Sequence, residues 1–368
     1  MSFSRREFMK WTAAVSTLVA TWPDGIGAGR LLAAGAPRDF QPNLLPNQKE
    51  VWDHQVWMAK LGPKYTGNPA HTTFVEWLAT ELKALGLDVA RERYTFPRWE
   101  ANRWNIDVTT SSGDRLKIPV SSYFPYSGET SSAGVTGELV YAGSNPNFKL
   151  EGLEEKIAFV DFATNTREWQ KTYQTWGVNP PGEVFPDAYR PARAAINDLT
   201  QFKKAGAIGV ILGWTDVSDA NAADQYTPFS RPPQGVPGLY VGRDAGTRLK
   251  TLAGTGAKAT VILEATTFPN TPTNSLIATL PGASSDEIII VNTHTDGPNA
   301  TEENGAIGIL ALAKYFSKIP RADRRRTLVF PLTTGHFAGP WVPSIRGVIE
   351  KYPELIKKAV AALTVEHL

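Results

Sequence analysis

The chain has 368 residues, so we expect about two domains. Its content of 42% hydrophobic and 20% charged residues is ordinary for a globular protein, and a net charge of +2 gives no reason to expect a nucleic-acid partner. The absence of cysteine excludes disulfides, thiolate metal ligands and a cysteine nucleophile. Any metal ion must therefore be held by histidine and carboxylate side chains.

The N-terminal segment resembles an export signal. The run Ser4 to Lys10 contains the paired arginines Arg5 and Arg6 of the twin-arginine type, and an apolar stretch from Trp11 to Trp22 follows. That stretch has about twelve residues, whereas a membrane-spanning helix needs roughly 20, so we expect no stable membrane span after signal removal. We predict a signal peptide over residues 1–36 and a periplasmic or secreted protein; the alternative is a soluble amphipathic leader.

After this segment the apolar spacing between Val51 and Leu85 predicts two helices, separated at Gly62-Pro63 and ended by Gly86. Strands are expected over 87–96 and 104–108. From about residue 134 the sequence consists of short β-rich runs separated by glycine, proline and asparagine, and this pattern predicts a compact β-rich domain. Its expected elements are strands over 137–141, 156–162, 208–212, 238–241 and 257–263, helices over 191–205 and 245–252, and a loop over 163–189.

Toward the C-terminus strands and helices alternate. Strands are expected over 275–280, 288–292, 327–332 and 360–365, and helices over 306–316 and 342–351. This alternation indicates an α/β sheet covered on both faces and interrupted by the β-rich insert.

The residues that could carry chemistry follow these strands, at the sheet edge where α/β proteins place their sites. His294 and Asp296 follow the strand at 288–292 and point to the same side, because side chains alternate along a strand. His294 could bind a metal ion while Asp296 orients its ring, or it could be a structural histidine. His336 and Glu366, the latter next to His367, follow two further strands, where each could be a ligand or a structural hydrogen-bonding group.

Three other residues are less defined by their positions. Glu303 lies at the start of the helix over 306–316, either as a carboxylate favoured by the helix dipole or as one shared by two metal ions. His54 and His71 lie in the N-terminal helical region, where surface or interface positions are expected.

Three segments of the sequence carry a family pattern: Asn274 to Gly282, Ile288 to Gly297 and Glu302 to Gly305. They resemble the "I-A-x-L-P-G", "H-x-D" and "D-D-N-G" motifs of the co-catalytic zinc aminopeptidases, a family that includes glutamate carboxypeptidase-like enzymes. The insert resembles a protease-associated domain in the runs Lys156 to Val160, Lys204 to Ile211 and Val236 to Val241. The resemblance implies a zinc-exopeptidase-like mixed sheet covered by helices over 37–133 and 268–368, with the protease-associated domain over 134–267.

The same resemblance implies roles for individual residues. His294 matches a zinc ligand, Asp296 its supporting carboxylate, and Glu303 and Glu366 two aspartate ligands. The two glutamates are longer than aspartate by about 1.5 Å. Where the family has Gly-Glu-Glu, this chain has Gly335-His336-Phe337, so His336 stands at the position of the general base and Phe337 replaces a ligand. The family's last histidine ligand would lie beyond Leu368, so either the sequence is truncated or a complete two-zinc site is absent.

Three hypotheses about function follow. The first is an exported aminopeptidase-like hydrolase that holds one or two zinc ions, acts on peptides and uses His336 to relay a proton. The second is an inactive homologue that binds a protein partner through the protease-associated domain. The third is a hydrolase that uses one metal ion at His294, His336 and Glu366 with another substrate.

Overall fold

The computed structural model describes residues 40–163, 198–224 and 230–368. The chain divides into two compact units: unit 1 comprises residues 1–96 and 270–368, and unit 2 comprises residues 97–269. The predicted signal peptide, most of the predicted loop over 163–189 and the start of the helix expected from residue 191 lie outside the described residues. Within the described residues, no helix has the length and apolar character needed to cross a membrane.

Unit 1 is built on a mixed sheet. Its strands lie in the order β12 (Ala359–Thr364), β10 (Ser284–His294), β11 (Arg326–Thr333) and the C-terminal part of β9 (Lys258–Leu280). β10 runs parallel to both β11 and β12, whereas β9 is antiparallel to β11. In the register of β10 and β11, His294 lies opposite Thr333. The carboxyl ends of three neighbouring strands therefore meet at one edge.

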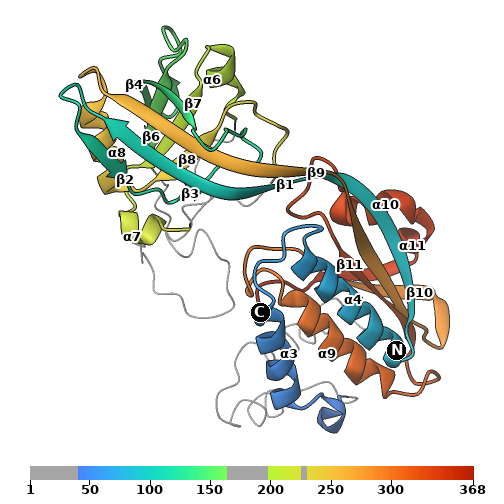
Figure 1. Cartoon of the computed structure of the whole chain (residues 1–368). Helices are drawn as coiled ribbons and strands as arrows, with labels where there is room; N and C mark the ends of the chain where they lie inside the picture. The colour runs from blue at the N-terminus through green and yellow to red at the C-terminus, as the bar shows by residue number, and fades with distance from the viewer. Residues whose placement is uncertain (1–39, 164–197, 225–229) are drawn as a thin grey trace, which may run out of the picture. The chain divides into compact units, whose positions relative to one another are not determined.

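Helices cover both faces of this sheet (Figure 1). Along β11, Leu328 and Phe330 pack with α3 (Gln48–Lys60), α4 (Pro69–Ala84) and α9 (Gly305–Ser317). The intervening Val329 packs against α10 (Ser344–Lys351) and α11 (Pro353–Lys357) on the other face. The alternation of side chains along each strand thus fills two separate cores. This mixed α/β sheet covered by helices confirms the predicted fold class.

The start of α9 is tied to the segment that follows β12. The side-chain Nδ2 of Asn304 donates to the carbonyl oxygen of Leu368 at 2.6 Å, and its Oδ1 accepts from the Leu368 nitrogen at 2.8 Å. A Cβ on Gly305 would lie 2.0 Å from the carbonyl oxygen of Val365, so only glycine permits this close approach. The Glu302–Glu303 turn and Glu366 are held near each other as a result.

Buried hydroxyl groups join the strand ends of unit 1. The Thr295 nitrogen and hydroxyl both donate to the Thr333 carbonyl, at 2.8 and 3.1 Å, and the Thr333 hydroxyl donates to the Thr293 carbonyl at 3.2 Å. The Ser275 hydroxyl accepts from the Thr334 nitrogen at 3.0 Å. We call this set the hydroxyl belt; its buried members are Thr273, Ser275, Thr293, Thr295, Thr333 and Thr334.

Unit 2 contains a second group of strands. β3 (Ser122–Tyr123), β8 (Gly238–Val241), β7 (Gly209–Trp214), β6 (Ile157–Phe162) and β4 (Val135–Ser144) lie side by side, and β4 also pairs with the N-terminal part of β9. Every residue of β6 and β7 is buried, between two hydrophobic cores. The described residues of unit 2 also form β2 (Arg115–Ile118), β5 (Asn147–Phe148), α6 (Thr200–Lys204), α7 (Asp219–Ala222) and α8 (Arg243–Leu252).

Two strands are longer than expected. Apart from residue 87, β1 (Asp88–Thr109) includes both strands expected over 87–96 and 104–108. Apart from residue 257, β9 includes those expected over 257–263 and 275–280. The polar residues between the apolar runs remain extended because they pair across β1 and β9: Asn102 Nδ2 donates to Thr266 Oγ1 at 2.8 Å, and Arg103 Nε donates to Glu264 at 2.7 Å.

The division between the units also differs from the expected domain boundaries at 133/134 and 267/268. Unit 2 begins at Pro97 and ends at Pro269. The first boundary lies earlier because Ile106, Val108 and Ile118 of β1 and β2 are buried in the same core as Leu139 and Val261. The assignment of the insert as a protease-associated domain stays a prediction.

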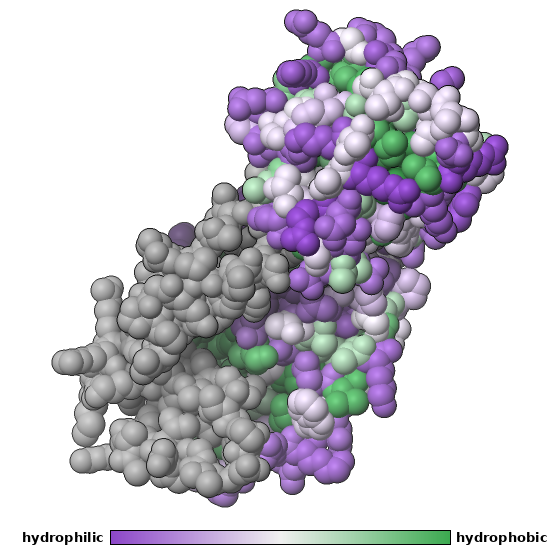
Figure 2. All heavy atoms as spheres, turned by 90° about the vertical axis from the view of Figure 1, so that its left-hand side faces the viewer, coloured by the Kyte–Doolittle hydropathy of each residue, from purple (hydrophilic) through white to green (hydrophobic). Residues whose placement is uncertain are grey.

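On the face shown in Figure 2, hydrophilic side chains predominate and hydrophobic ones form small separate areas. The large hydrophobic side chains that are exposed in the described residues belong to α3, β9, α10 and β12, namely Trp52, Phe268, Ile349 and Val360.

Candidate metal centre

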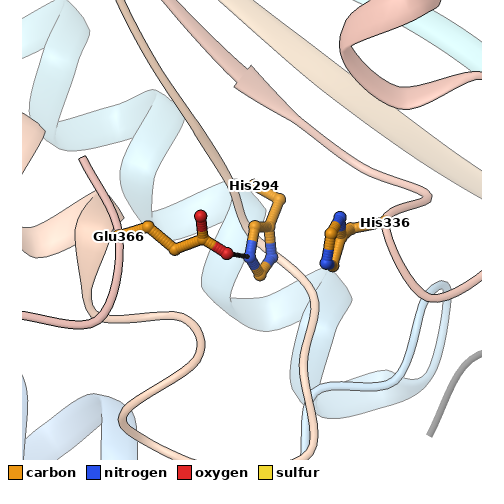
Figure 3. Close-up of side chains that lie close together, drawn as sticks. All are labelled: His294, His336 and Glu366. Atoms are coloured by element: carbon orange, nitrogen blue, oxygen red, sulfur yellow. Dashed lines mark hydrogen bonds and ion pairs between the residues drawn. The ribbon is translucent and has the colours of Figure 1, made fainter. Parts of the chain in front are cut away.

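Three of the predicted site residues meet at the carboxyl edge of the unit 1 sheet. His294 ends β10, His336 lies in the turn after β11, and Glu366 follows β12 (Figure 3). One ligand atom from each lies within 4.8 Å of the others. The Nε2 atom of His294 is 3.0 Å from Glu366 Oε1, and the rings of His294 and His336 stack with their centroids 4.2 Å apart. Two imidazoles and one carboxylate form a ligand set typical of catalytic zinc.

The electrostatics suit these side chains to a cation. Burial opposes the charged form of His294, but the hydrogen bond to Glu366 and the charge of Asp296 outweigh it and raise the pKa of His294. The hydrogen bond with His294 lowers the pKa of Glu366 despite partial burial. Burial, together with the nearby His294, lowers the pKa of His336. His336 is therefore favoured in its neutral form, which can bind a metal ion or accept a proton.

Asp296 acts on the site differently from the expectation. The ring of His294 is oriented by the backbone carbonyl of Asp296, 2.7 Å from Nδ1, rather than by its carboxylate. That carboxylate is fully buried and accepts hydrogen bonds from the Thr66 hydroxyl at 2.5 Å and from the backbone nitrogens of Gly335, His336 and Phe337 at 3.2, 3.4 and 3.0 Å. The preceding residue, Thr295, binds the Thr333 carbonyl at the end of β11. Asp296 thus holds the backbone that carries His336.

Glu303 is not among the side chains that gather their ligand atoms around His294. Its carboxylate is fully buried and lies 3.6 Å from the ammonium group of Lys64, which is buried as well. Burial raises the pKa of Glu303 to about 7, although the charge of Lys64 opposes this shift. Lys64 is not one of the residues that the sequence pattern singled out.

A second group of ligand atoms shares Glu366. It comprises Glu302, Glu366 and His367, again within 4.8 Å of one another, and the Nε2 atom of His367 is 2.8 Å from Glu302 Oε2. The side chain of His367 is 37% exposed, so this group lies closer to solvent than the first. We regard it as an ion-paired rim, since exposed groups of this kind are common without a metal.

The surface or interface position expected for His71 is wrong: this residue is buried, with 1% of its surface exposed. Its Nδ1 atom accepts from the Gly67 nitrogen at 3.1 Å, and its Nε2 atom lies 2.9 Å from the Thr295 hydroxyl. The sequence did contain a signal, because His71 is three and four residues before the buried Phe74 and Val75 and so shares the apolar face of α4.

Phe337 closes the apolar side of the cluster. It is buried, and its ring meets those of His294 and His336 edge to face, with centroids 5.9 and 4.9 Å away. A phenyl ring has no ligand atom, so the side chain of Phe337 contributes packing to the cluster but no metal ligand.

Comparisons with known proteins agree on the fold. No protein-family model and no curated protein matches the sequence. The structure is similar to an aminopeptidase from an Aneurinibacillus species, with a TM-score of 0.59, 18% identity and coverage of 88% of this chain and 70% of that one. It is also similar to a peptidase M28 precursor from Shewanella amazonensis, with a TM-score of 0.61, 18% identity and coverage of 85% of this chain and 69% of that one. A third similar structure is a zinc aminopeptidase from Bacillus subtilis, with a TM-score of 0.57, 17% identity and coverage of 88% of this chain and 70% of that one.

These similarities give the class of fold. Unit 1 has the mixed α/β sheet of the zinc-exopeptidase fold, and 85–88% of the chain is structurally similar to M28 zinc aminopeptidases. At 17–18% identity the likeness extends to the fold alone.

Proposed function

We propose that the protein is an exported, metal-dependent hydrolase of the aminopeptidase type, acting on peptides. The observation that carries this proposal is the meeting of His294, His336 and Glu366 from three adjacent strand ends, with ligand atoms within 4.8 Å. The similarity of the fold to zinc aminopeptidases supports the same class of reaction.

The residues present fit a zinc ion. Because Nδ1 of His294 meets a backbone carbonyl, the Nε2 atom is left to face Glu366 and to serve as a ligand. When bound, zinc supplies Lewis-acid polarisation of a peptide carbonyl and lowers the pKa of water. His294 and Glu366 would hold the ion, Phe337 packs against both imidazole rings, and the Asp296-anchored loop fixes His336.

His336 serves as the third ligand or as the general base, and kinetics separates these roles. Replacing a ligand lowers zinc affinity, whereas replacing a base lowers kcat with the zinc content retained. The His336→Gln variant therefore assigns the residue once both quantities are measured.

The direct test of the function is metal content combined with cleavage of amino-acid anilides. We expect about one zinc ion per purified chain, consistent with one His/Glu ligand set, and measurable anilide hydrolysis. His294→Gln should lose both, whereas His54→Gln, a histidine that packs on Trp77 outside the cluster, should retain both. A folded wild-type chain that binds no zinc would remove the hydrolase proposal.

The inactive homologue is the second candidate, and Phe337 is the observation that favours it. This buried ring stands where the resembled family has a ligand. A folded chain that binds peptide or protein partners through unit 2 but has neither zinc nor activity would support it. Replacement of His336 and Phe337 by glutamate would then be expected to restore zinc binding.

A further inference from the structure

Lys64 is a buried cation next to the candidate metal centre. It lies between α3 and α4, where its backbone exchanges two hydrogen bonds with Gly297, at 2.8 and 2.9 Å. Its Nζ atom donates to the carbonyl oxygens of Gly62 and Met58 at 2.8 and 3.2 Å. The side chain is 1% exposed. Lysine is almost never buried to this extent without a partner of opposite charge.

The partner of Lys64 is Glu303. The carboxylate of Glu303 is 0% exposed, and neither of its oxygens has a hydrogen-bond partner among the described residues. The 3.6 Å separation from Lys64 Nζ is an ion-pair distance, too long for a hydrogen bond. An ammonium group has three donors, and two already point to carbonyl oxygens. The positive charge of Lys64 is thus the main charge that compensates Glu303, with a smaller contribution from His294.

The pair has little room to rearrange. A Cβ on Gly297 would lie 2.9 Å from Glu303 Cγ, so the backbone that binds Lys64 also packs against the carboxylate arm. Met58, whose carbonyl accepts from Lys64, is fully buried in α3. The ammonium group is therefore held in a fixed, buried position by these contacts.

We propose that the Lys64 ammonium group is a built-in cation that takes the place of a second metal ion at Glu303. By the sequence resemblance Glu303 stands where a carboxylate is shared by two ions, but here its charge is already compensated. A further divalent cation at the same carboxylate would be repelled by Lys64. Phe337, which packs against His294 and His336 and has no ligand atom, offers no further donor to a second ion. The two-ion arrangement thus does not fit these residues, and Glu303 is a charge partner of Lys64 rather than a ligand.

This proposal rests on the proposed function for the identity of the remaining ion site, His294, His336 and Glu366. The first test is the zinc stoichiometry and affinity of Glu303→Gln. We expect both to stay within about twofold of wild type, in contrast to the roughly 10-fold or greater loss that removal of a true ligand causes. Loss of an ion, or a 10-fold weaker affinity, in a Glu303→Gln protein of wild-type circular dichroism would overturn the proposal.

The second test needs no metal. Lys64→Met, Glu303→Gln and the double variant are compared by thermal unfolding in the presence of a chelator, with Lys64→Arg as a charge-retaining control. We expect each single variant to lower Tm by about 5 °C or more and the double variant to lower it by less than the sum, because each single change leaves a buried group unpaired. Additive shifts would contradict the pairing. If the protein binds no zinc but shows this coupling, the proposed hydrolase function is contradicted while the pairing of Lys64 with Glu303 is supported.

Discussion

The carboxylate of Asp296 accepts a hydrogen bond from the backbone nitrogen of Phe337 at 3.0 Å. The same carboxylate also binds the backbone of Gly335 and His336 and the hydroxyl of Thr66. One buried side chain therefore joins the N-terminal region, the end of β10 and the loop after β11. The position of His336 thus depends on a residue that binds its backbone nitrogen.

The first prediction concerns this anchor. Asp296→Asn replaces one acceptor oxygen by an amide that faces backbone donors, so the loop should lose its fixed geometry. We expect zinc affinity to fall about 10- to 100-fold, as for other residues that orient ligands. Thr66→Val is the matched control, because it removes only one of the four hydrogen bonds and should cost less than tenfold. Competition with a chromogenic chelator measures both, and equal affinities in all three proteins would show that the loop is held without Asp296.

A second prediction follows from His71. Its Nδ1 atom accepts from Gly67, so the proton lies on Nε2 and is donated to Thr295, whose own hydrogen goes to Thr333. Burial lowers the pKa of His71 to about 4, against about 6.5 in the unfolded chain. Between these pH values the unfolded chain binds more protons. The stabilising contribution is thus complete above about pH 6.5 and is lost as the pH falls toward 4.

Urea unfolding at pH 7.5 and pH 4.5 measures this effect. The shift in pKa corresponds to at most about 3 kcal/mol of unfolding free energy. His71→Gln has no titratable ring, so its stability should change less between the two pH values than that of wild type. Other titrating groups are common to both proteins and cancel in the comparison. The same change in both proteins would contradict the assignment.

The third prediction tests the junction between α9 and the segment after β12. Gly305→Ala would place a Cβ 2.0 Å from the Val365 carbonyl and 2.4 Å from the Thr293 hydroxyl, so the backbone has to move. We expect a loss of about 1–3 kcal/mol in the free energy of unfolding, typical of overpacking. Gly339→Ala is the control, because its Cβ would meet no atom within 4 Å; its effect should stay within about 0.5 kcal/mol. Equal stabilities of the two variants in denaturant titrations would contradict the close approach.

The fourth prediction concerns export. Replacing Arg5 and Arg6 by lysine keeps the charge of the N-terminal segment but removes the paired arginines. We expect the double variant to remain inside the producing cell as an unprocessed precursor, whereas wild type is found in the exported fraction. Immunoblots of fractionated cells compare the two. Export of both proteins to the same extent would rule out the twin-arginine route.

The sequence predicts those parts of the site that depend on local periodicity. Apolar runs located β10, β11 and β12, and this placed His294, His336 and Glu366 at neighbouring strand ends that the structure brings together. The fold class follows from the alternation of these strands with α9 and α10. Local periodicity does not predict contacts between distant segments when the residues lie outside such strand ends.

Lys64 shows this limit most clearly. It meets Glu303 from more than two hundred residues away in the sequence, and a single lysine after Gly62-Pro63 resembles an ordinary solvated residue. Asp296 shows a related limit: the spacing from His294 predicted that the two are coupled, but not that the backbone carbonyl, instead of the carboxylate, meets the ring. Side-chain direction after a strand end is set by the turn, which the period of two no longer governs.

The hydroxyl belt affects how measurements of ion binding at different pH values are interpreted. Threonine and serine do not change charge between pH 5 and 8, so the framework beneath the histidines keeps the same bonds while imidazoles gain or lose protons. A change in ion uptake over that interval would therefore report on the titrating side chains, the ligands and Glu303 among them, and not on the hydroxyl belt.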